Sequence, residues 1–281
     1  MTLESGFVKQ PSSIAPVALT VAGFDPSSGA GITADLKVLA AHGVYGVAAI
    51  TALTVQSTQG VRRVEPVWDR VLRDTLECLA EDVVGGYAQF AGVKIGMLGS
   101  AANVRALVGF LRKAKIPRER VVLDPVLRSS SGADLLDPVG VGVLRDDLLE
   151  LAGWVTPNVD ELGALVGEPA GKTVPNRDRV PELARRLTAT APGLNVVVTG
   201  GHLDPPDDFL LTAEGNVTWF LGTRIETTST HGTGCVFSSA LLCRLLAGDG
   251  PVEAVRGAKD FVRRALETAV PVGKGRGPVL R

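Results

Sequence analysis

Short apolar runs alternate along the chain with longer stretches in which apolar residues recur every three or four positions. The short runs are rich in Val, Ile, Leu and Ala and are bounded by turn-forming residues, a pattern typical of strands buried on both faces. They occupy residues 17–23, 45–53, 90–98, 120–126, 154–158 and 194–201. We expect these runs to form a largely parallel sheet.

The longer stretches have the spacing of amphipathic helices. They predict helices over residues 32–43, 67–82, 101–115, 141–153, 159–167, 179–191, 234–247 and 251–269. Residues 209–221 instead predict a hairpin that turns at Glu214-Gly215-Asn216. Because strands and helices alternate throughout, we predict an α/β fold of three layers, with helices on both faces of a mostly parallel sheet.

Three segments lie outside this alternation. Residues 1–14 predict a flexible N-terminal arm, which leaves residues 15–281 as a single domain. Residues 54–66 are polar and turn-like. Residues 127–140 would form either a mobile flap over a site or a surface loop, and composition does not choose between the two.

Charge and cysteine content restrict the function classes. The 281 residues carry a formal net charge of −1, which provides no broad basic field for nucleic acid or an anionic membrane. The three cysteines cannot all pair and show no zinc-ligand spacing, which fits a reducing compartment. No apolar run approaches membrane-spanning length, and residues 1–14 lack the apolar core of a signal peptide. We therefore expect a soluble cytoplasmic protein.

A glycine-containing turn at Thr230-His231-Gly232-Thr233-Gly234-Cys235 precedes the predicted helix over 234–247. Unpaired N–H groups at a helix N-terminus bind anions, most often phosphate. Cys235 falls on the first helical turn, where the same field is expected to lower the pKa of its thiol. The alternatives are a loop before a core helix with Cys235 as a buried apolar residue, or a redox-sensing thiol.

Carboxylates follow several of the predicted strands. Asn158 and Glu161 stand three apart at a helix start, where they could hold Mg²⁺ or simply form a capping box. Asp124 ends the strand VVLD and is a further candidate metal ligand. The loop 23–37 contains the small residues Gly29-Ala30-Gly31, which allow a close ligand approach, and two candidate carboxylates, Asp25 and Asp35. Its alternative role is an ordinary strand–helix turn.

Several common site motifs are missing from the sequence. There is no GxxxxGK[ST] phosphate loop, no GxGxxG after the first strand and no GxSxG elbow. The stretch GKGRG at 273–277 has neither the strand before it nor the helix after it that a Walker motif requires. These absences argue against a P-loop nucleotidase, a nicotinamide enzyme and an esterase-type hydrolase.

An ordered set of segments over residues 17–279 resembles one enzyme family closely. In chain order the segments are ALTVAGFDPSSGAGITADLK, YGVAAITALTVQSTQGV, VKIGMLG, VVLDPVLRSSSGADLLD, VTPNVDELGALVG, VVVTGGHL, STHGTGCVFSSAL and VGKGRGPV. They are similar to the hydroxymethylpyrimidine/phosphomethylpyrimidine kinases of thiamine biosynthesis, in the ribokinase superfamily. The resemblance implies a ribokinase-like fold and ATP- and Mg²⁺-dependent phosphorylation of 4-amino-5-hydroxymethyl-2-methylpyrimidine, then of its monophosphate. It also implies that the partners are the small-molecule pyrimidine and ATP, with no nucleic acid or membrane, and that the protein forms a homodimer.

The resemblance implies roles for individual residues. Cys235 would be the catalytic residue, with Gly232, Thr233 and Gly234 forming an anion hole. Gln56 would bind the edge of the aminopyrimidine, and Ala30, Thr54, Met97 and Val126 would line its ring. Asn158, Glu161 and Thr199 would contact the nucleotide, with Glu161 and Asp124 at the metal.

Two positions depart from the family pattern. Thr199 stands where the family often has lysine, which removes a positive charge from the phosphate side, and Thr33 stands where glutamine or asparagine is frequent. Two other functions stay open at the level of sequence. One is a pyridoxal kinase of the same branch, and the other is a non-catalytic pyrimidine-binding module. Without the family resemblance, Gln56 would be interpreted as an exposed loop residue.

Overall fold

The computed structural model describes residues 15–82, 90–114, 116–129, 132–168 and 176–280. The predicted arm over 1–14 lies outside these residues. Nine strands form one sheet in the order β3-β2-β1-β4-β5-β6-β7-β8-β9 within the described part of the chain. The strands are β1 (Val17–Phe24), β2 (Tyr45–Ser57), β3 (Gly60–Pro66), β4 (Gly92–Ile95), β5 (Val121–Leu123), β6 (Trp154–Val155), β7 (Asn195–Val198), β8 (Asp208–Leu211) and β9 (Val217–Phe220).

The six central strands, from β2 to β7, run parallel to one another. Only the edges are antiparallel, where β3 pairs with β2 and the β8–β9 hairpin pairs with β7. The predicted mostly parallel sheet and the predicted hairpin over 209–221 are thereby confirmed. The carboxyl ends of the parallel strands all point to one edge of the sheet, where such folds bind ligands.

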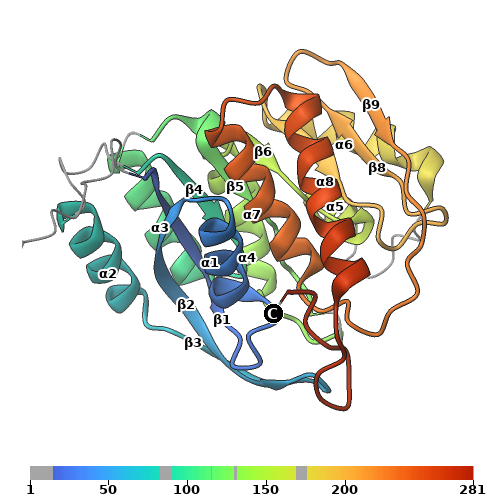
Figure 1. Ribbon diagram of the computed structural model, residues 1–281. Helices are drawn as coiled ribbons and strands as arrows, with labels where there is room; N and C mark the ends of the chain where they lie inside the picture. Colours follow the sequence, from blue (N-terminus) through green and yellow to red (C-terminus); the bar gives the residue numbers. More distant parts are fainter. Residues whose placement is uncertain (1–14, 83–89, 115, 130–131, 169–175, 281) are drawn as a thin grey trace, which may run out of the picture.

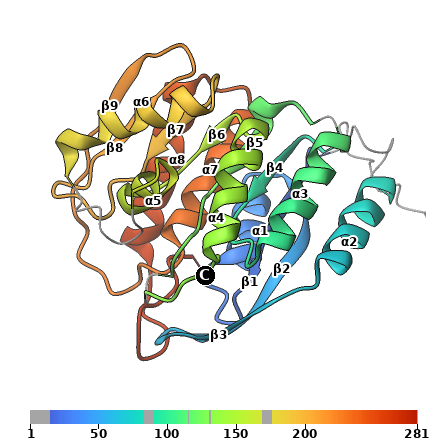
Figure 2. The same ribbon diagram turned by 180° about the vertical axis from the view of Figure 1, so that it is seen from behind.

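Helices cover both faces of the sheet. The helices are α1 (Gly31–Ala41), α2 (Asp69–Asp82), α3 (Ala101–Ala114), α4 (Pro138–Val143), α5 (Val159–Leu165), α6 (Val180–Thr190), α7 (Thr233–Leu246) and α8 (Pro251–Thr268). Helices α1, α7 and α8 lie on the face toward the viewer in Figure 1. Helices α2 to α6 lie on the opposite face, seen in Figure 2. The expected three-layer architecture is confirmed.

The strands divide their side chains between two cores, one under each helical layer. Leu19 and Val21 of β1 pack in the core beneath α2 to α6, whereas Ala18 packs in the core beneath α1, α7 and α8. The same alternation recurs in β5, where Val122 faces away from Val121 and Leu123. Successive strand residues point to opposite faces, so a sheet covered on both sides needs apolar residues at consecutive positions.

Two segments differ from the sequence-based expectation. Residues 54–66 are not merely turn-like, because β2 continues to Ser57 and pairs with β3 through Gln56 and Ser57. Exposed arginines in β3 hide the strand pattern, and an edge strand tolerates such residues. Residues 127–129 and 132–135 pair as the two arms of a small hairpin, in which Leu135 N–H donates to Leu127 O, and Asp137 then caps α4. This hairpin is called the flap hairpin below.

Candidate functional site

A cavity of about 540 Å³ opens at the carboxyl ends of the parallel strands. Loops after β1, β4, β5, β6 and β7 contribute to it, together with β2, the flap hairpin and the N-terminus of α7. Every residue that the family resemblance implied for the site lines this one cavity. These residues are Ala30, Thr54, Gln56, Met97, Asp124, Val126, Asn158, Glu161, Thr199, Gly232, Thr233, Gly234 and Cys235.

The N-terminus of α7 is built to leave its first amides unpaired. Gly232 adopts φ +86°, and no side chain caps the helix. A Cβ atom at this position would lie 1.8 Å from Gly29 O, so the loop before α1 packs directly against the backbone here. His231 N–H donates to Gly277 O and Val279 N–H donates to His231 O, so the C-terminal segment braces the same turn. The result is a rigid amide cluster facing the cavity, suited to an anion.

Cys235 stands on this first turn, and its sulfur accepts a hydrogen bond from Gly31 N–H at the start of α1. Burial raises the pKa of the thiol to about 12, which the nearby Lys94 ammonium only partly opposes. The expectation that the helix terminus lowers this pKa is therefore wrong for the free protein, because desolvation outweighs the favourable charges. All three cysteines, Cys78, Cys235 and Cys243, are free, and the redox-sensing alternative for Cys235 stays a prediction.

A fully buried lysine lies beneath this turn. Lys94 Nζ, from β4, lies 3.0 Å from Asp35 Oδ1 and 3.9 Å from Asp124 Oδ2. Burial lowers the pKa of Lys94, but Asp35 and the other anionic neighbours outweigh it and raise the value overall. Thr20 Oγ1 and Ser239 Oγ also donate to the Asp35 carboxylate. The ammonium therefore anchors α1 and α7 to the sheet and places a positive charge behind Cys235.

A second polar cluster joins three distant segments. Asp25 Oδ2 accepts from His231 Nε2 over 2.7 Å, and the carboxylate also accepts from Ser27 and from the amides of Gly29 and Ala30. Burial raises the pKa of Asp25, but the hydrogen bonds from His231 and Ser27 outweigh it and hold the value below its usual range. The carboxylate therefore fixes the loop that faces the α7 N-terminus.

Gln56 Nε2 lies 3.0 Å from the same imidazole nitrogen, His231 Nε2. One nitrogen cannot donate to Asp25 and accept from an amide at once, and the charge-assisted bond to the carboxylate is the stronger. The Gln56 Nε2 group is thus left with a weak partner, whereas Gln56 Oε1 accepts from Thr54 Oγ1 over 3.2 Å, and Gln56 lines the cavity.

Asn158 and Glu161 form the capping box of α5 that the sequence left as an alternative. Glu161 N–H donates to Asn158 Oδ1, and Asn158 N–H donates to Glu161 Oε2. Both residues also line the cavity. Burial raises the pKa of Glu161 to about 8, with Asp124 adding to the rise, and burial also raises the pKa of Asp124.

These oxygen ligands suit a hard cation such as Mg²⁺, whose charge would relieve the repulsion between the two carboxylates. Within the described residues, no group of three or more His, Cys, Asp and Glu side chains could hold a metal by itself. A cation here would therefore need further oxygen ligands, which phosphates and water provide.

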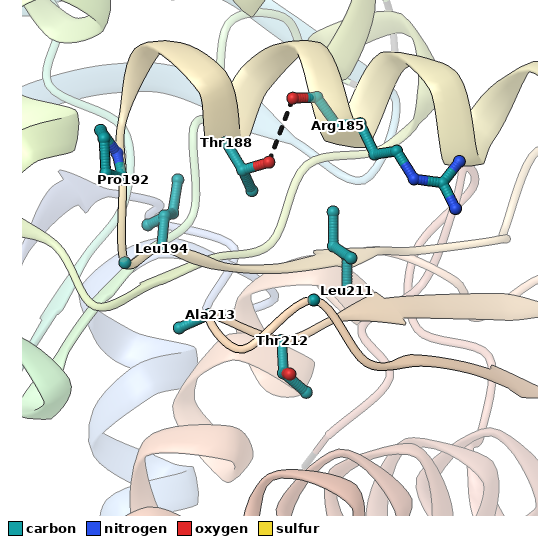
Figure 3. A pocket seen from close by; sticks show the side chains of 9 residues that line it. Arg185, Thr188, Pro192, Leu194, Leu211, Thr212 and Ala213 are labelled. Atoms are coloured by element: carbon teal, nitrogen blue, oxygen red, sulfur yellow. Dashed lines mark hydrogen bonds between the residues drawn. The ribbon is translucent and has the colours of Figure 1, made fainter.

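A smaller hollow of about 350 Å³ lies between α6 and β8, at the amino end of β7 (Figure 3). Arg185 is the one ionisable residue that lines it, and Thr188 Oγ1 donates back to Arg185 O within the helix. Its lining residues provide no acid–base pair and no amide cluster. The larger cavity is therefore the better candidate for an active site.

Sequence reasoning missed the role of three residues. Lys94 interrupts an otherwise apolar strand, and this was the one local signal of a buried ion pair. His231 and its partner Asp25 lie 206 positions apart, which no local pattern links. Arg128 lies on the flap hairpin and lines the cavity, although it was not proposed for the site. Asp35, a candidate carboxylate, pairs with Lys94 instead of lining the cavity.

Comparison with known proteins gives a consistent result. The sequence model of the family described as phosphomethylpyrimidine kinase matches residues 25–280. The chain is 37% identical to the hydroxymethylpyrimidine/phosphomethylpyrimidine kinase of Haemophilus influenzae, over 92% of this chain and 94% of that protein. It is 41% identical to the thiamine biosynthesis multifunctional protein ThiED of Corynebacterium efficiens, covering 94% of this chain but only 35% of that longer protein.

Solved structures agree with the sequence comparison. The crystal structure of phosphomethylpyrimidine kinase from Clostridium difficile matches with a TM-score of 0.74 and 33% identity, over 89% of this chain and 99% of that one. Pyridoxal kinase from Staphylococcus aureus in complex with ADP matches with a TM-score of 0.81 and 27% identity, over 95% of this chain and 93% of that one.

In the described part of the chain, no helix has the length and apolar character needed to cross a membrane.

Proposed function

The chain belongs to the phosphomethylpyrimidine kinase family and is a kinase, a phosphotransferase, and we propose that it phosphorylates 4-amino-5-hydroxymethyl-2-methylpyrimidine and then its monophosphate, in thiamine biosynthesis. ATP is the phosphoryl donor. The observation that carries the proposal is the gathering of an uncapped helix N-terminus, a cysteine, paired carboxylates and an apolar pocket in one cavity. Such a cavity can align two substrates and neutralise phosphate charge, which is most of what phosphoryl transfer requires.

The acceptor ring fits the side of the cavity nearest β2. Ala30, Thr54, Met97 and Val126 line this region, and Gln56 offers an amide to the edge of an aminopyrimidine. A buried ring edge left unpaired would cost about 1–3 kcal/mol, so this contact discriminates between heterocycles.

The phosphoryl group would lie at the α7 N-terminus. The amides of Gly232, Thr233 and Gly234 stabilise the negative charge that develops on it. Cys235 accepts the proton of the hydroxymethyl group as the alcohol oxygen bonds to the γ-phosphorus, and ADP leaves with the electrons of the broken P–O bond. Because burial raises the pKa of the thiol, this role requires thiolate to form in the complex, where Lys94 and the helix amides stabilise it.

The nucleotide would bind along the carboxyl ends of β6 and β7. Asn158, Glu161 and Thr199 face this part of the cavity. Magnesium bound with the nucleotide would neutralise phosphate charge, and Glu161 and Asp124 are the residues that would hold it. Thr199 replaces the lysine frequent in the family and provides a neutral hydrogen bond to a phosphate oxygen, so the α7 amides would carry more of the charge.

The quaternary state and location complete the proposal. We expect a homodimer and a cytoplasmic location. The exposed apolar side chains Leu53 and Val55 on β2 are one surface that a second copy could bury.

Turnover with different acceptors tests the proposed function. Release of ADP from ATP is measured with hydroxymethylpyrimidine, with pyridoxal and with no acceptor. We expect the pyrimidine to give the largest kcat/KM. A larger value for pyridoxal would assign the chain to the activity of its structural neighbours from Staphylococcus aureus, and no acceptor-dependent release would contradict the proposal.

A further inference from the structure

The two acceptors of the proposed reaction differ mainly in charge. The first acceptor presents a neutral hydroxymethyl group, whereas the second presents a phosphate with a charge of about −1.5 to −2 at neutral pH. The cavity is lined by four carboxylic acids, Asp25, Asp124, Asp160 and Glu161. The ATP phosphates repel a charged acceptor, so a cation beside the acceptor phosphate would favour the second reaction, whereas the first reaction has no such charge to offset.

Arg128 is the only arginine or lysine among the described residues that line the cavity. Its Nε lies 2.7 Å from Asp134 Oδ1 across the base of the flap hairpin. The two side chains are 45% and 71% exposed, so the ion pair is well solvated. Breaking the Arg128–Asp134 pair costs little free energy, because exposed ion pairs are weak. The freed guanidinium can then bind two phosphate oxygens through parallel hydrogen bonds.

The flap hairpin holds Arg128 near the expected acceptor group. Leu135 packs in one apolar cluster with Met97 and Val126, which are proposed to contact the ring. Leu127, also in the hairpin, donates its N–H to the carboxylate of Glu161 on α5. The base of the hairpin therefore lies between the ring pocket and the phosphate-binding side of the cavity.

We propose that Arg128 is a specificity-determining residue that binds the phosphate of the monophosphate acceptor in the second phosphorylation, a role that rests on the proposed function. The guanidinium leaves Asp134 and pairs with non-bridging oxygens of that phosphate. Another oxygen of the same phosphate then attacks the γ-phosphorus of ATP, the β–γ bond breaks and ADP leaves. The attacking oxygen is already deprotonated near neutral pH, so this step needs charge neutralisation and no general base.

Two substitutions at the same ion pair test the proposal. Arg128→Gln removes the cation, and Asp134→Asn breaks the pair while it keeps the arginine. For each variant, kcat/KM is measured with the alcohol and with the monophosphate at saturating ATP. Calorimetry gives the affinity for the monophosphate without turnover, and thermal unfolding checks that both variants fold.

For Arg128→Gln we expect kcat/KM with the monophosphate and its affinity to fall by about 10- to 100-fold, the usual size of a charge-assisted contact. Its kcat/KM with the alcohol stays within about twofold of wild type. Asp134→Asn keeps both activities, because the guanidinium remains. Equal losses with both acceptors, equal losses in both variants, or no loss in Arg128→Gln would overturn the role of Arg128. Wild-type protein that phosphorylates neither acceptor would instead contradict the proposed function itself.

Discussion

Lys94 Nζ lies 3.0 Å from Asp35 Oδ1, and neither side chain is exposed to solvent. The pair joins β4 to α1, and Ser239 of α7 donates to the same carboxylate. Three elements that shape the floor of the cavity therefore meet at one buried charge pair. Both residues of such a pair are needed for stability, because a buried charge that loses its partner is strongly destabilising.

Lys94→Met is expected to lower the free energy of unfolding by about 3–5 kcal/mol, since it leaves Asp35 buried and unpaired. Urea denaturation followed by circular dichroism measures the change. The double variant Lys94→Met with Asp35→Asn should regain part of the loss, because Asp35 then carries no unpaired charge. A single variant as stable as wild type would show that the pair does not hold these elements together.

Gly232→Ala should abolish turnover and destabilise the fold, because its Cβ would lie 1.8 Å from Gly29 O. Gly248→Ala is the matched control, with φ +91° and no atom within 4 Å of the added Cβ. It suffers backbone strain alone, about 1–2 kcal/mol, and keeps its activity. Activity assays and thermal unfolding of both variants separate the clash from the strain. Similar behaviour of the two variants would refute the close packing at the α7 N-terminus.

Stability should fall as pH rises from about 5 to 8 because of Glu161. A glutamate in water has a pKa of 4.5, and burial raises the pKa of Glu161 to about 8 in the folded protein. Between these values the folded state holds the extra proton, so the free energy of unfolding falls with pH, by at most about 1.4 kcal/mol per unit. Glu161→Gln should flatten this decline, and Glu182→Gln, at an exposed position on α6, should not. Identical pH profiles for wild type and Glu161→Gln would contradict the raised pKa.

Cys235→Ala should lower turnover of the alcohol acceptor by about 10²–10⁴-fold, the usual contribution of a general base. Turnover of the monophosphate should fall much less, because its attacking oxygen carries no proton. Wild-type kcat/KM for the alcohol should rise with pH into the alkaline range, since this ratio reports the free protein, in which burial raises the pKa of the thiol to about 12. An alanine variant that loses both reactions equally would assign Cys235 a packing role instead.

Alkylation of the free protein gives an independent view of the thiols. Cys78 is exposed, whereas burial raises the pKa of both Cys235 and Cys243 to about 12. Iodoacetamide at a mildly alkaline pH should therefore modify Cys78 well before the other two, as peptide mass spectrometry would detect. Rapid modification of Cys235 would mean that a thiolate exists before substrates bind.

The layers and the parallel core of the sheet could be predicted from the sequence, because apolar runs and amphipathic helices each have a strong local pattern. The site residues implied by the family resemblance all line one cavity, since most of the quoted segments contain the loops that follow the parallel strands. Strand β3 was missed because an edge strand with exposed side chains at Arg62 and Arg63 has little apolar signal.

The electrostatics of the site were beyond sequence reasoning. Asp35 on α1 and Asp124 at the end of β5 keep Lys94 protonated by raising its pKa, and neither is near Lys94 in the sequence. The pKa of Cys235 was misjudged for the same reason, because the helix terminus is a local feature whereas desolvation depends on the whole fold. The pairing of Asp25 with His231 likewise exists only once the chain has folded.

A crystal structure of the protein with a non-hydrolysable ATP analogue, Mg²⁺ and hydroxymethylpyrimidine would test the central claim most directly. We expect the γ-phosphate to lie on the amides of Gly232, Thr233 and Gly234, with the hydroxymethyl oxygen beside Cys235 Sγ and the ring edge on Gln56. Phosphates bound away from the α7 N-terminus, or a sulfur that faces only aliphatic side chains in that complex, would contradict it.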